Sequence, residues 1–148
     1  MADVLTPDQR ARAMSAVRSR NTTPELRLRR ALHARGFRFR LHRRDLPGSP
    51  DLVLPRFNAC VFVHGCFWHR HPGCPRTTTP ATRTDYWGPK FARNQQRDAA
   101  AIEELSARGW RVAVVWECGL SVRKTPDVAD ALAAWLRGGD PMIELPGG

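Results

Sequence analysis

The sequence lacks several features that would place a protein in a special class. No apolar run approaches the roughly 18 residues that a membrane-spanning helix needs, and there is no repeat or low-complexity segment. The N-terminal residues also lack the basic and then apolar plan of a signal peptide. We therefore expect one domain over residues 1–148 and a cytoplasmic location.

Lysine and acidic residues are scarce, whereas arginine is abundant. The chain holds 24 Lys and Arg but only 14 Asp and Glu, which gives a formal net charge of +10. Half of the basic residues, all of them arginine, lie within residues 1–44. A GC-rich codon bias explains arginine over lysine but not the excess of base over acid. We expect a nucleic-acid partner, with residues 1–20 as a basic DNA-binding arm or helix.

Apolar residues make up 42% of the chain, which is enough for a globular core. Periodicity and turn residues predict helices over residues 6–18, 24–35, 91–107 and 126–136, and strands over residues 37–41, 51–54, 59–63 and 110–116. Residues 64–89 are expected to be irregular, and residues 137–148 to be a flexible tail. This order predicts an α/β fold with a central mixed sheet flanked by helices.

Only four cysteines are present, at positions 60, 66, 74 and 118. A reducing cytosol disfavours disulfides, and interleaved histidines indicate a metal site instead. Cys66, His71 and Cys74 fall within nine residues, and Cys118 follows an expected strand. Such a set is common for structural Zn²⁺, which would also keep a long proline-rich segment ordered.

Alternatives remain for this cluster. His69 competes with His71 as the histidine ligand, because spacing alone does not separate them. Cys66 and Cys74 could be incidental free thiols, although the Cys/His spacing favours zinc. Cys60 lies among apolar residues of an expected strand and is interpreted as a small core residue.

A second group of polar residues surrounds the expected hairpin. Asp51 starts its first strand, and its second strand ends at Val63 and His64. A carboxylate and a backbone carbonyl supply the oxygen ligands that Mg²⁺ takes in a nuclease site. Glu25 could hold the metal waters. The histidine side chain ordinarily has a pKa near neutrality, so His64 and His69 would suit proton transfer or contact with a phosphate.

Each of these residues also has a structural interpretation. Asp51 follows a proline in a turn, and Glu25 compensates the dipole of a first helical turn. His64 and His69 could be solvated loop residues. Their combination beside a metal cluster and a basic arm favours a nuclease site.

Large aromatic residues lie in the segment expected to be irregular: Phe67, Trp68, Tyr86 and Trp87. Core rings of this size usually come from strands and helices, so we expect some of these to be exposed. Exposed rings can insert between base steps, and a mismatched pair lowers the unstacking cost. One or two of these rings could instead pack over the zinc loop, which we expect for Tyr86 and which could also apply to one tryptophan.

With these motifs in place, the chain resembles the very short patch repair (Vsr) endonucleases from about residue 8 to residue 136. The most specific motifs are HGCFWH at 64–69, ATRT with YW at 81–87, and VWEC at 115–118. Further matching segments are residues 14–20, 23–25, 46–53, 94–98 and 109–112. The resemblance implies a restriction-endonuclease-like three-layer fold with a structural zinc site. It also implies a bacterial, nucleoid-associated enzyme that nicks one strand 5′ of the T in a T:G mismatch left by deamination of 5-methylcytosine.

The resemblance assigns catalytic roles to individual residues. Asp51 would be the central Mg²⁺ ligand together with the Val63 carbonyl, and Glu25 would lie behind the metal-bound waters. His69 would be the general base, because the acid-x-Lys pair of related nucleases is absent here. His64 would contact the scissile phosphate.

The remaining contacts are also implied by the resemblance. Zinc would be bound by Cys66, His71, Cys74 and Cys118. Mismatched double-stranded DNA would be contacted by Met14 from the opposite groove, by Phe67, Trp68 and Trp87 within the base stack, and by Lys90 and Asn94 at flanking bases. A monomer is expected. Two alternatives stay open, namely a nuclease of the same fold that cuts unmismatched or modified DNA, and a zinc-stabilised DNA-binding module without catalysis.

Overall fold

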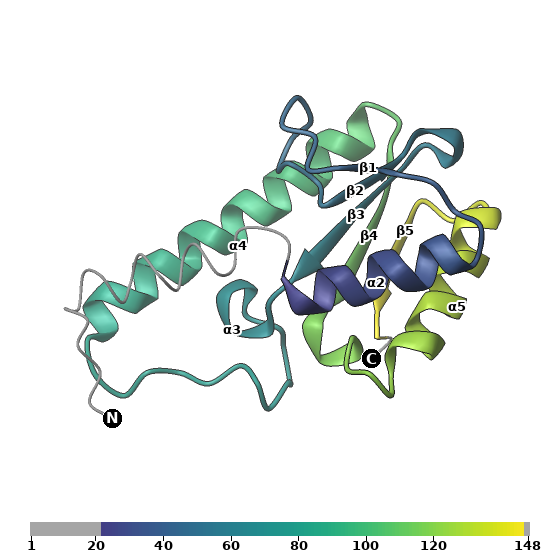
Figure 1. Cartoon of the computed structure of the whole chain (residues 1–148). Coiled ribbons are helices and arrows are strands. Elements are labelled where there is room, and N and C mark those ends of the chain that lie inside the picture. Colours follow the sequence, from purple (N-terminus) through teal and green to yellow (C-terminus); the bar gives the residue numbers. More distant parts are fainter. Residues whose placement is uncertain (1–21, 147–148) are drawn as a thin grey trace.

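A computed structural model describes residues 22–146 of the chain (Figure 1). The expected basic arm over residues 1–20, its helix over residues 6–18, and Met14 lie outside this described part. Within it, no helix is long and apolar enough to cross a membrane. The sheet and the helices on its two faces determine where the candidate residues lie.

Helix α2, Thr23–Ala34, begins at a pair of threonines followed by a proline. Its cap is Thr22, one residue earlier than expected, whose hydroxyl oxygen accepts a hydrogen bond from the backbone N–H of Glu25 over 3.4 Å. Leu28 and Leu32 are fully buried and, being four residues apart, lie on one face of the helix. Glu25 is also buried, so its carboxylate lies inside the protein rather than at a solvated helix end.

The structure confirms the expected hairpin. Strand β2, Leu52–Leu54, pairs antiparallel with β3, Ala59–His64. A 3-10 turn at Pro55–Phe57 and Asn58 in the left-handed region (φ 51°) reverse the chain between them. The short strand β1, Arg40–Leu41, pairs with the other edge of β2 and is shorter than predicted.

Strand β4, Arg111–Trp116, runs parallel to β3 and is buried, as its continuous apolar run predicts. The expectation of a flexible tail over residues 137–148 is wrong for its central part, because β5, Met142–Leu145, pairs parallel with β4. Of these four residues Leu145 alone is buried, so the local sequence signal for a strand is weak and pairing with β4 determines it. The sheet order is β1-β2-β3-β4-β5, a mixed sheet.

The proline-rich segment after β3 contains more helix than expected. Cys66–His69 forms the short helix α3, and α4, Thr84–Ala107, begins well before the predicted start at residue 91. Pro89 lies inside α4, where it removes one backbone N–H donor. The rings of Trp87 and Phe91, four residues apart, stack with centroids separated by 5.7 Å. The stacking of these two rings therefore stabilises the helix on both sides of Pro89.

Helices cover both faces of the sheet and make three layers (Figure 1). On one face α2 and α5, Thr125–Arg137, pack over a buried cluster that includes Val61 and Leu132. On the other face α4 packs over a second cluster that includes Phe62 and Leu105. Successive residues of β3 thus point into different layers, as the pleat of a strand requires.

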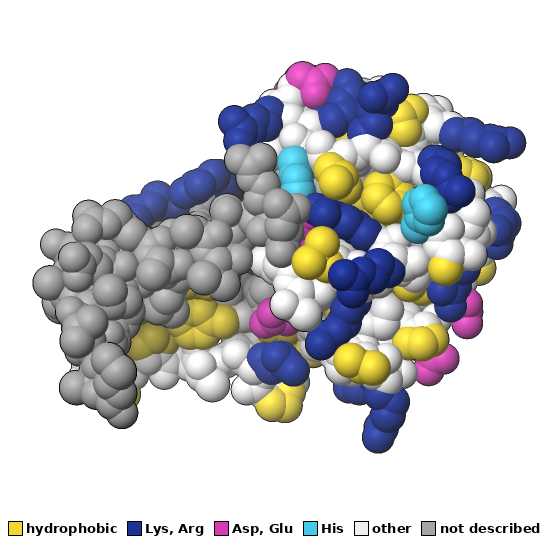
Figure 2. All heavy atoms as spheres, viewed as in Figure 1, with side chains coloured by type: hydrophobic (Ala, Val, Ile, Leu, Met, Phe, Trp, Pro, Cys, Tyr) yellow, Lys and Arg dark blue, Asp and Glu magenta, His cyan; other side chains and the backbone are white. Residues whose placement is uncertain are grey.

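Basic side chains gather over α2 and near the β1–β2 end of the sheet on the face shown in Figure 2, and acidic side chains are fewer there. This distribution agrees with the excess of base over acid in the sequence. A positive field of this kind attracts a polyanion, and the attraction weakens as salt rises.

Candidate active site and metal centre

Three residues from separate segments meet beside the start of β2. Glu25 of α2, His42 after β1 and Asp51 before β2 each place one ligand atom within 4.8 Å of the others. Glu25 Oε2 lies 2.8 Å from His42 Nε2 and also accepts the guanidinium of Arg29. Asp51 Oδ2 accepts a hydrogen bond from the backbone N–H of Val63 over 2.7 Å. The structure therefore brings together the two predicted carboxylates and adds a histidine.

The electrostatics of Asp51 follow from this crowding. Burial raises the pKa of Asp51 to about 7, aided by the Glu25 carboxylate and opposed by the hydrogen bond from Val63. Two carboxylates this close repel each other unless one of them is protonated or a cation lies between them. Their oxygen atoms suit a hard divalent cation such as Mg²⁺.

A second group holds the two predicted histidines. His64, at the end of β3, and His69, in α3, stack with ring centroids 3.9 Å apart and planes inclined by 5°. His69 Nδ1 lies 2.6 Å from Oδ2 of Asp98 on α4, so we assign the ring proton to Nδ1 and a lone pair to Nε2. Burial, and after it the charge of His69, lower the pKa of His64 to about 3. His64 is therefore neutral at physiological pH.

Asp51 of the first group and all three residues of the second line one cleft. It has a volume of about 370 Å³, and its walls include Asp51, His64, His69 and Asp98. A second hollow of about 280 Å³ shares the two histidines and Asp98. A phosphate in the first cleft would meet a carboxylate and an imidazole together, an arrangement suited to hydrolysis.

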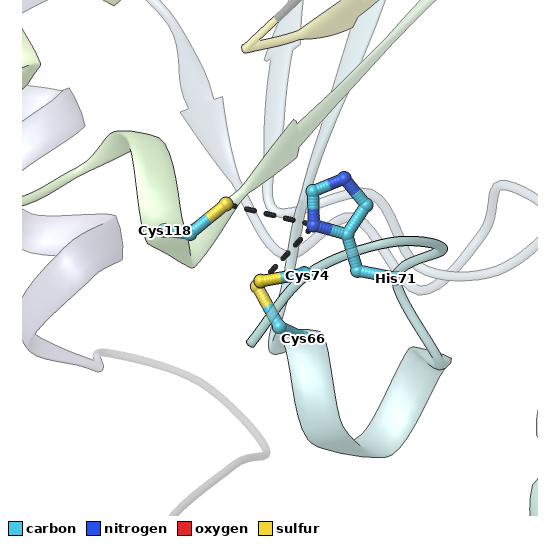
Figure 3. A group of neighbouring side chains, drawn as sticks. All are labelled: Cys66, His71, Cys74 and Cys118. Atoms are coloured by element: carbon cyan, nitrogen blue, oxygen red, sulfur yellow. Dashed lines mark hydrogen bonds between the residues drawn. The ribbon is translucent and has the colours of Figure 1, made fainter. Parts of the chain in front are cut away.

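The predicted Cys/His cluster is assembled in the structure (Figure 3). Cys66, His71 and Cys74 face Cys118, which lies in the 3-10 turn Glu117–Gly119 after β4. His71 Nδ1 lies 3.5 Å from Sγ of Cys118 and 3.7 Å from Sγ of Cys66. Ordinary Zn–S and Zn–N bonds in a tetrahedron place sulfur and nitrogen about 3.6 Å apart. These four side chains therefore fit a metal ion of that geometry.

The structure distinguishes the two histidines that compete as ligands of the Cys/His cluster. His71 lies with the thiols, whereas His69 lies with His64 and Asp98. The His71 ring stacks on Trp116 at 4.2 Å, and Trp116 meets the His64 ring edge-on at 5.3 Å. The Cys/His cluster thus contacts the histidine pair through one tryptophan.

An aromatic cluster lies between α3 and α4. The Phe67 ring has its centroid 5.1 Å from that of Trp68, 5.9 Å from that of Trp87 and 5.3 Å from that of Phe91. Phe67 and Trp87 are half-buried, but Trp68 is only 9% exposed. The Trp68 ring is therefore not exposed. Helix α4 begins early enough to include Trp87, whose ring packs against that of Trp68.

Lys90 and Asn94, expected at flanking bases, lie on α4 beside the same rings. Asn94 is buried, and its Nδ2 donates to the backbone carbonyl of Trp68 over 3.4 Å. Lys90 Nζ lies 3.5 Å from the hydroxyl oxygen of Tyr86 and 5.8 Å from the centroid of the Trp68 ring. Asn94 also lines the cleft that holds Asp51, His64 and His69.

Comparison with known proteins relates this geometry to a family. A family model described as DNA mismatch endonuclease Vsr matches residues 2–75. The DNA mismatch endonuclease Vsr of Escherichia coli (strain K12) is 42% identical over 141 residues, which cover 93% of this chain and 90% of that protein. The chain belongs to the Vsr family of DNA mismatch endonucleases. The resemblance inferred from the motifs is thereby confirmed.

Other relatives of the Vsr-family chain are described as nicking enzymes. The type II nicking enzyme V.XorIIP of Xanthomonas oryzae pv. oryzae is 54% identical over 121 residues, 82% of this chain and 88% of that protein. The type II nicking enzyme V.NmeAIP of Neisseria meningitidis is 39% identical over 120 residues, 81% of this chain and 85% of that protein. Membership of the Vsr family makes this chain a DNA endonuclease, a hydrolase that acts on DNA.

Two further residues of the candidate site have little signal in the sequence. Asp98 is one of several charged residues on α4, and His42 stands among arginines between a short strand and a turn. Neither lies at a motif spacing with its partner, so only the tertiary contacts with His69 and Glu25 reveal them. The local signals for Asp98 are its place at the end of the matching segment 94–98 and its position four residues after Asn94, on the same face of the helix.

Proposed function

We propose that this protein is a Mg²⁺-dependent endonuclease that nicks one strand 5′ of the T in a T:G mismatch left by deamination of 5-methylcytosine. The observation that carries the proposal is one cleft in which the Asp51 carboxylate and the His69–Asp98 pair lie together. We further propose a restriction-endonuclease-like fold, with residues 1–148 as one endonuclease domain that binds double-stranded DNA as a monomer.

Asp51 is the proposed direct ligand of Mg²⁺, joined by the Val63 carbonyl, and Glu25 orients the waters of the ion. The N–H and C=O of a strand residue point toward the same neighbouring strand. Because the Val63 N–H bonds to Asp51, its carbonyl faces that side too. Bound Mg²⁺ would stabilise the charge that develops on the phosphate and acidify a water. The donor set of carboxylate and carbonyl oxygens matches this ion.

His69 is the proposed general base. Asp98 holds the Nδ1 proton, so the lone pair on Nε2 can accept a proton from the attacking water. The water oxygen then bonds to phosphorus as the bond to the leaving sugar oxygen breaks. His64, with its pKa near 3, serves as a neutral hydrogen-bond donor to a phosphate oxygen rather than as a cation.

The Cys/His cluster is proposed to hold structural Zn²⁺ through Cys66, His71, Cys74 and Cys118. Three thiolates and an imidazole are a common donor set for structural zinc. Since α3 begins at Cys66 and ends at His69, the ion would hold the general base in place. Trp116, between His71 and His64, would add a second support.

Preference for a mismatch is proposed to come from the aromatic cluster. A mismatched pair is easier to unstack than a matched one, so ring insertion is favoured there. The half-buried rings of Phe67 and Trp87 are the more accessible for insertion between bases. The buried ring of Trp68 could insert only after α3 shifts. The proposed DNA contacts are Met14, Phe67, Trp68, Trp87, Lys90 and Asn94.

One assay tests these claims. T:G and matched duplexes are incubated with wild type and with Asp51→Ala, with and without added Mg²⁺. We expect wild type to nick the T:G duplex only with Mg²⁺, and Asp51→Ala to be slower on the order of 10³-fold, since a metal ion contributes several kcal/mol of transition-state stabilisation. Inactivity of wild type in every sequence context would favour the zinc-stabilised binding module.

A second candidate is nicking of unmismatched or modified DNA. It is favoured by the description of the relative at 54% identity as a type II nicking enzyme. Equal rates on matched and T:G duplexes would support it and contradict the mismatch proposal. A randomised T:G library would then identify the flanking bases.

A further inference from the structure

Two hydrogen-bond donors contact one oxygen atom of the Glu25 carboxylate. Its Oε2 lies 2.8 Å from Nε2 of His42 and accepts the guanidinium of Arg29, one helical turn further along α2. The side chains of Glu25 and His42 are 2% and 15% exposed, so little water competes for these contacts. A shielded, charge-assisted contact fixes the position of a carboxylate more strongly than a solvated one does.

His42 acts in this contact as a donor. A separation of 2.8 Å from a carboxylate oxygen requires a proton on Nε2, because two acceptors at that distance would repel. Arg29 Nη2, only 3.3 Å from Nε2, is also a donor. Both donors therefore hold the same carboxylate oxygen, Oε2.

The backbone around His42 directs its ring into the site. His42 has φ 47°, in the left-handed region that non-glycine residues adopt at a cost of about 1–2 kcal/mol. Its backbone N–H donates to the carbonyl oxygen of Asp51 over 3.1 Å. The residue is thus tied at its main chain to Asp51 and at its side chain to Glu25. Strain of this kind persists where the surrounding structure determines the conformation, often at functional sites.

We propose that His42 is a positioning residue of the metal site. Together with Arg29 it holds the Glu25 carboxylate in place beside Asp51 and the proposed metal ion. Since Nε2 donates to Glu25, His42 works through that carboxylate and not as a ligand. The inference rests on the proposed function, because it requires the Asp51 site to bind a divalent cation.

Metal affinity tests this proposal without turnover. Mn²⁺ is titrated into the full-length protein and followed by the electron paramagnetic resonance of the free ion, and the Mg²⁺ concentration for half-maximal nicking is measured in parallel. Loss of a hydrogen bond that orients a metal site typically weakens metal binding by about 10- to 100-fold. We expect that weakening in His42→Ala. His42→Gln, whose amide can donate to Glu25, should stay close to wild type.

Two controls separate positioning from general packing. His33→Ala removes an exposed histidine at the end of the same helix as Glu25 and should leave metal affinity unchanged. In a Glu25→Gln background, His42→Ala should cause no further loss, because residues that act through one another are not additive. Circular dichroism checks that each variant is folded.

Several results would overturn the proposal. They are His42→Ala matching His33→Ala in both measurements, equal losses in the Ala and Gln variants, or additive losses with Glu25→Gln. If His42→Ala does not fold, His42→Asn replaces it, since its shorter amide should not reach Glu25 and should lose affinity where Gln does not. Mg²⁺-dependent nicking by Asp51→Ala would instead refute the proposed function, independently of the result at His42.

Discussion

The two candidate metal groups of this protein are built in opposite ways. Three of the four residues in the Cys/His cluster come from residues 66–74, and Cys118 alone comes from a distant turn. The residues of the other group come from three separate elements. Glu25 lies in helix α2, His42 follows strand β1, and Asp51 directly precedes strand β2. One group is a local loop closed by a single long-range contact, whereas the other depends wholly on tertiary structure.

The chemistry of the two groups differs in the same way. Thiolates and an imidazole suit zinc, whose binding energy orders the loop that supplies the ligands. The carboxylates of Glu25 and Asp51 lie inside a packed domain and repel each other. Packing of the hydrophobic core must therefore supply the free energy that holds them together. We therefore expect loss of the Cys/His cluster to lower stability, and loss of the group formed by Glu25, His42 and Asp51 to lower activity.

Removal of a cluster ligand is expected to have the largest effect. Cys118→Ala should abolish metal binding and lower the unfolding free energy by at least about 5 kcal/mol, because structural zinc contributes its binding energy to folding. Elemental analysis and urea unfolding measure the two effects. Cys60→Ala is the matched control, since Cys60 is buried in β3 outside the cluster and should keep about one zinc per chain. A metal-free Cys118→Ala with wild-type stability would contradict a structural role for the ion.

Removal of the base should leave folding intact. His69→Ala is expected to reduce the nicking rate by about 10²- to 10⁴-fold, the usual contribution of a general base, with the zinc content unchanged. Asp98→Asn should reduce the rate less, because the His69 ring remains but its Nδ1 partner is no longer a carboxylate. Single-turnover nicking at saturating enzyme measures both. A stability loss as large as that of Cys118→Ala would break the distinction between the two regions.

Acid should destabilise the protein through His64. Its folded pKa is about 3 because of burial, against an ordinary 6.5, so the unfolded chain takes up the proton first as the pH falls. The associated stability is complete above pH 6.5 and is lost progressively toward pH 3. Between pH 7 and pH 5, His64→Gln should lose about 2 kcal/mol less unfolding free energy than wild type. Urea unfolding at both values checks this, and parallel losses would refute it.

The smallest effect is expected at Arg70, which links the metal loop to α4. Its guanidinium lies 4.1 Å from the centroid of the Phe91 ring and donates to the carbonyl oxygen of Thr78 over 2.9 Å. Arg70→Ala should lower the unfolding free energy by about 1 kcal/mol. Arg76→Ala, at an exposed arginine of the same loop, should have no measurable effect. Equal thermal midpoints for the two variants would show that the link contributes nothing.

Parts of the fold were predictable because their signals are local. The hairpin and β4 follow from short apolar runs between turn residues, and α2 from its cap and Pro24. The start of α4 was not predictable, since Pro89 suggests a break and only the packing of Trp87 and Phe91 overrides it. β5 was missed because an edge strand with one buried residue has little local pattern and exists through its pairing.

The candidate site divides along the same line. Cys66, His71 and Cys74 were found from spacing, and Asp51 from its place at a strand start. The assignments of His42 and Asp98 had no such signal, because each depends on a partner at least 17 residues away in the chain. The burial of Trp68 and Asn94 was equally hidden, since it depends on how α3 packs against α4.

The sequence by itself therefore determined the Vsr family, the basic charge, the hairpin and the soft-ligand cluster, because each is encoded in neighbouring residues or in composition. Tertiary structure alone decided which histidine lies with the thiols, which carboxylate orients His69, and which donors grip Glu25. Those pairings form across strands and helices that meet only when the sheet buries both of its faces. Their geometry is a property of that packing and cannot be read from the spacing of the residues.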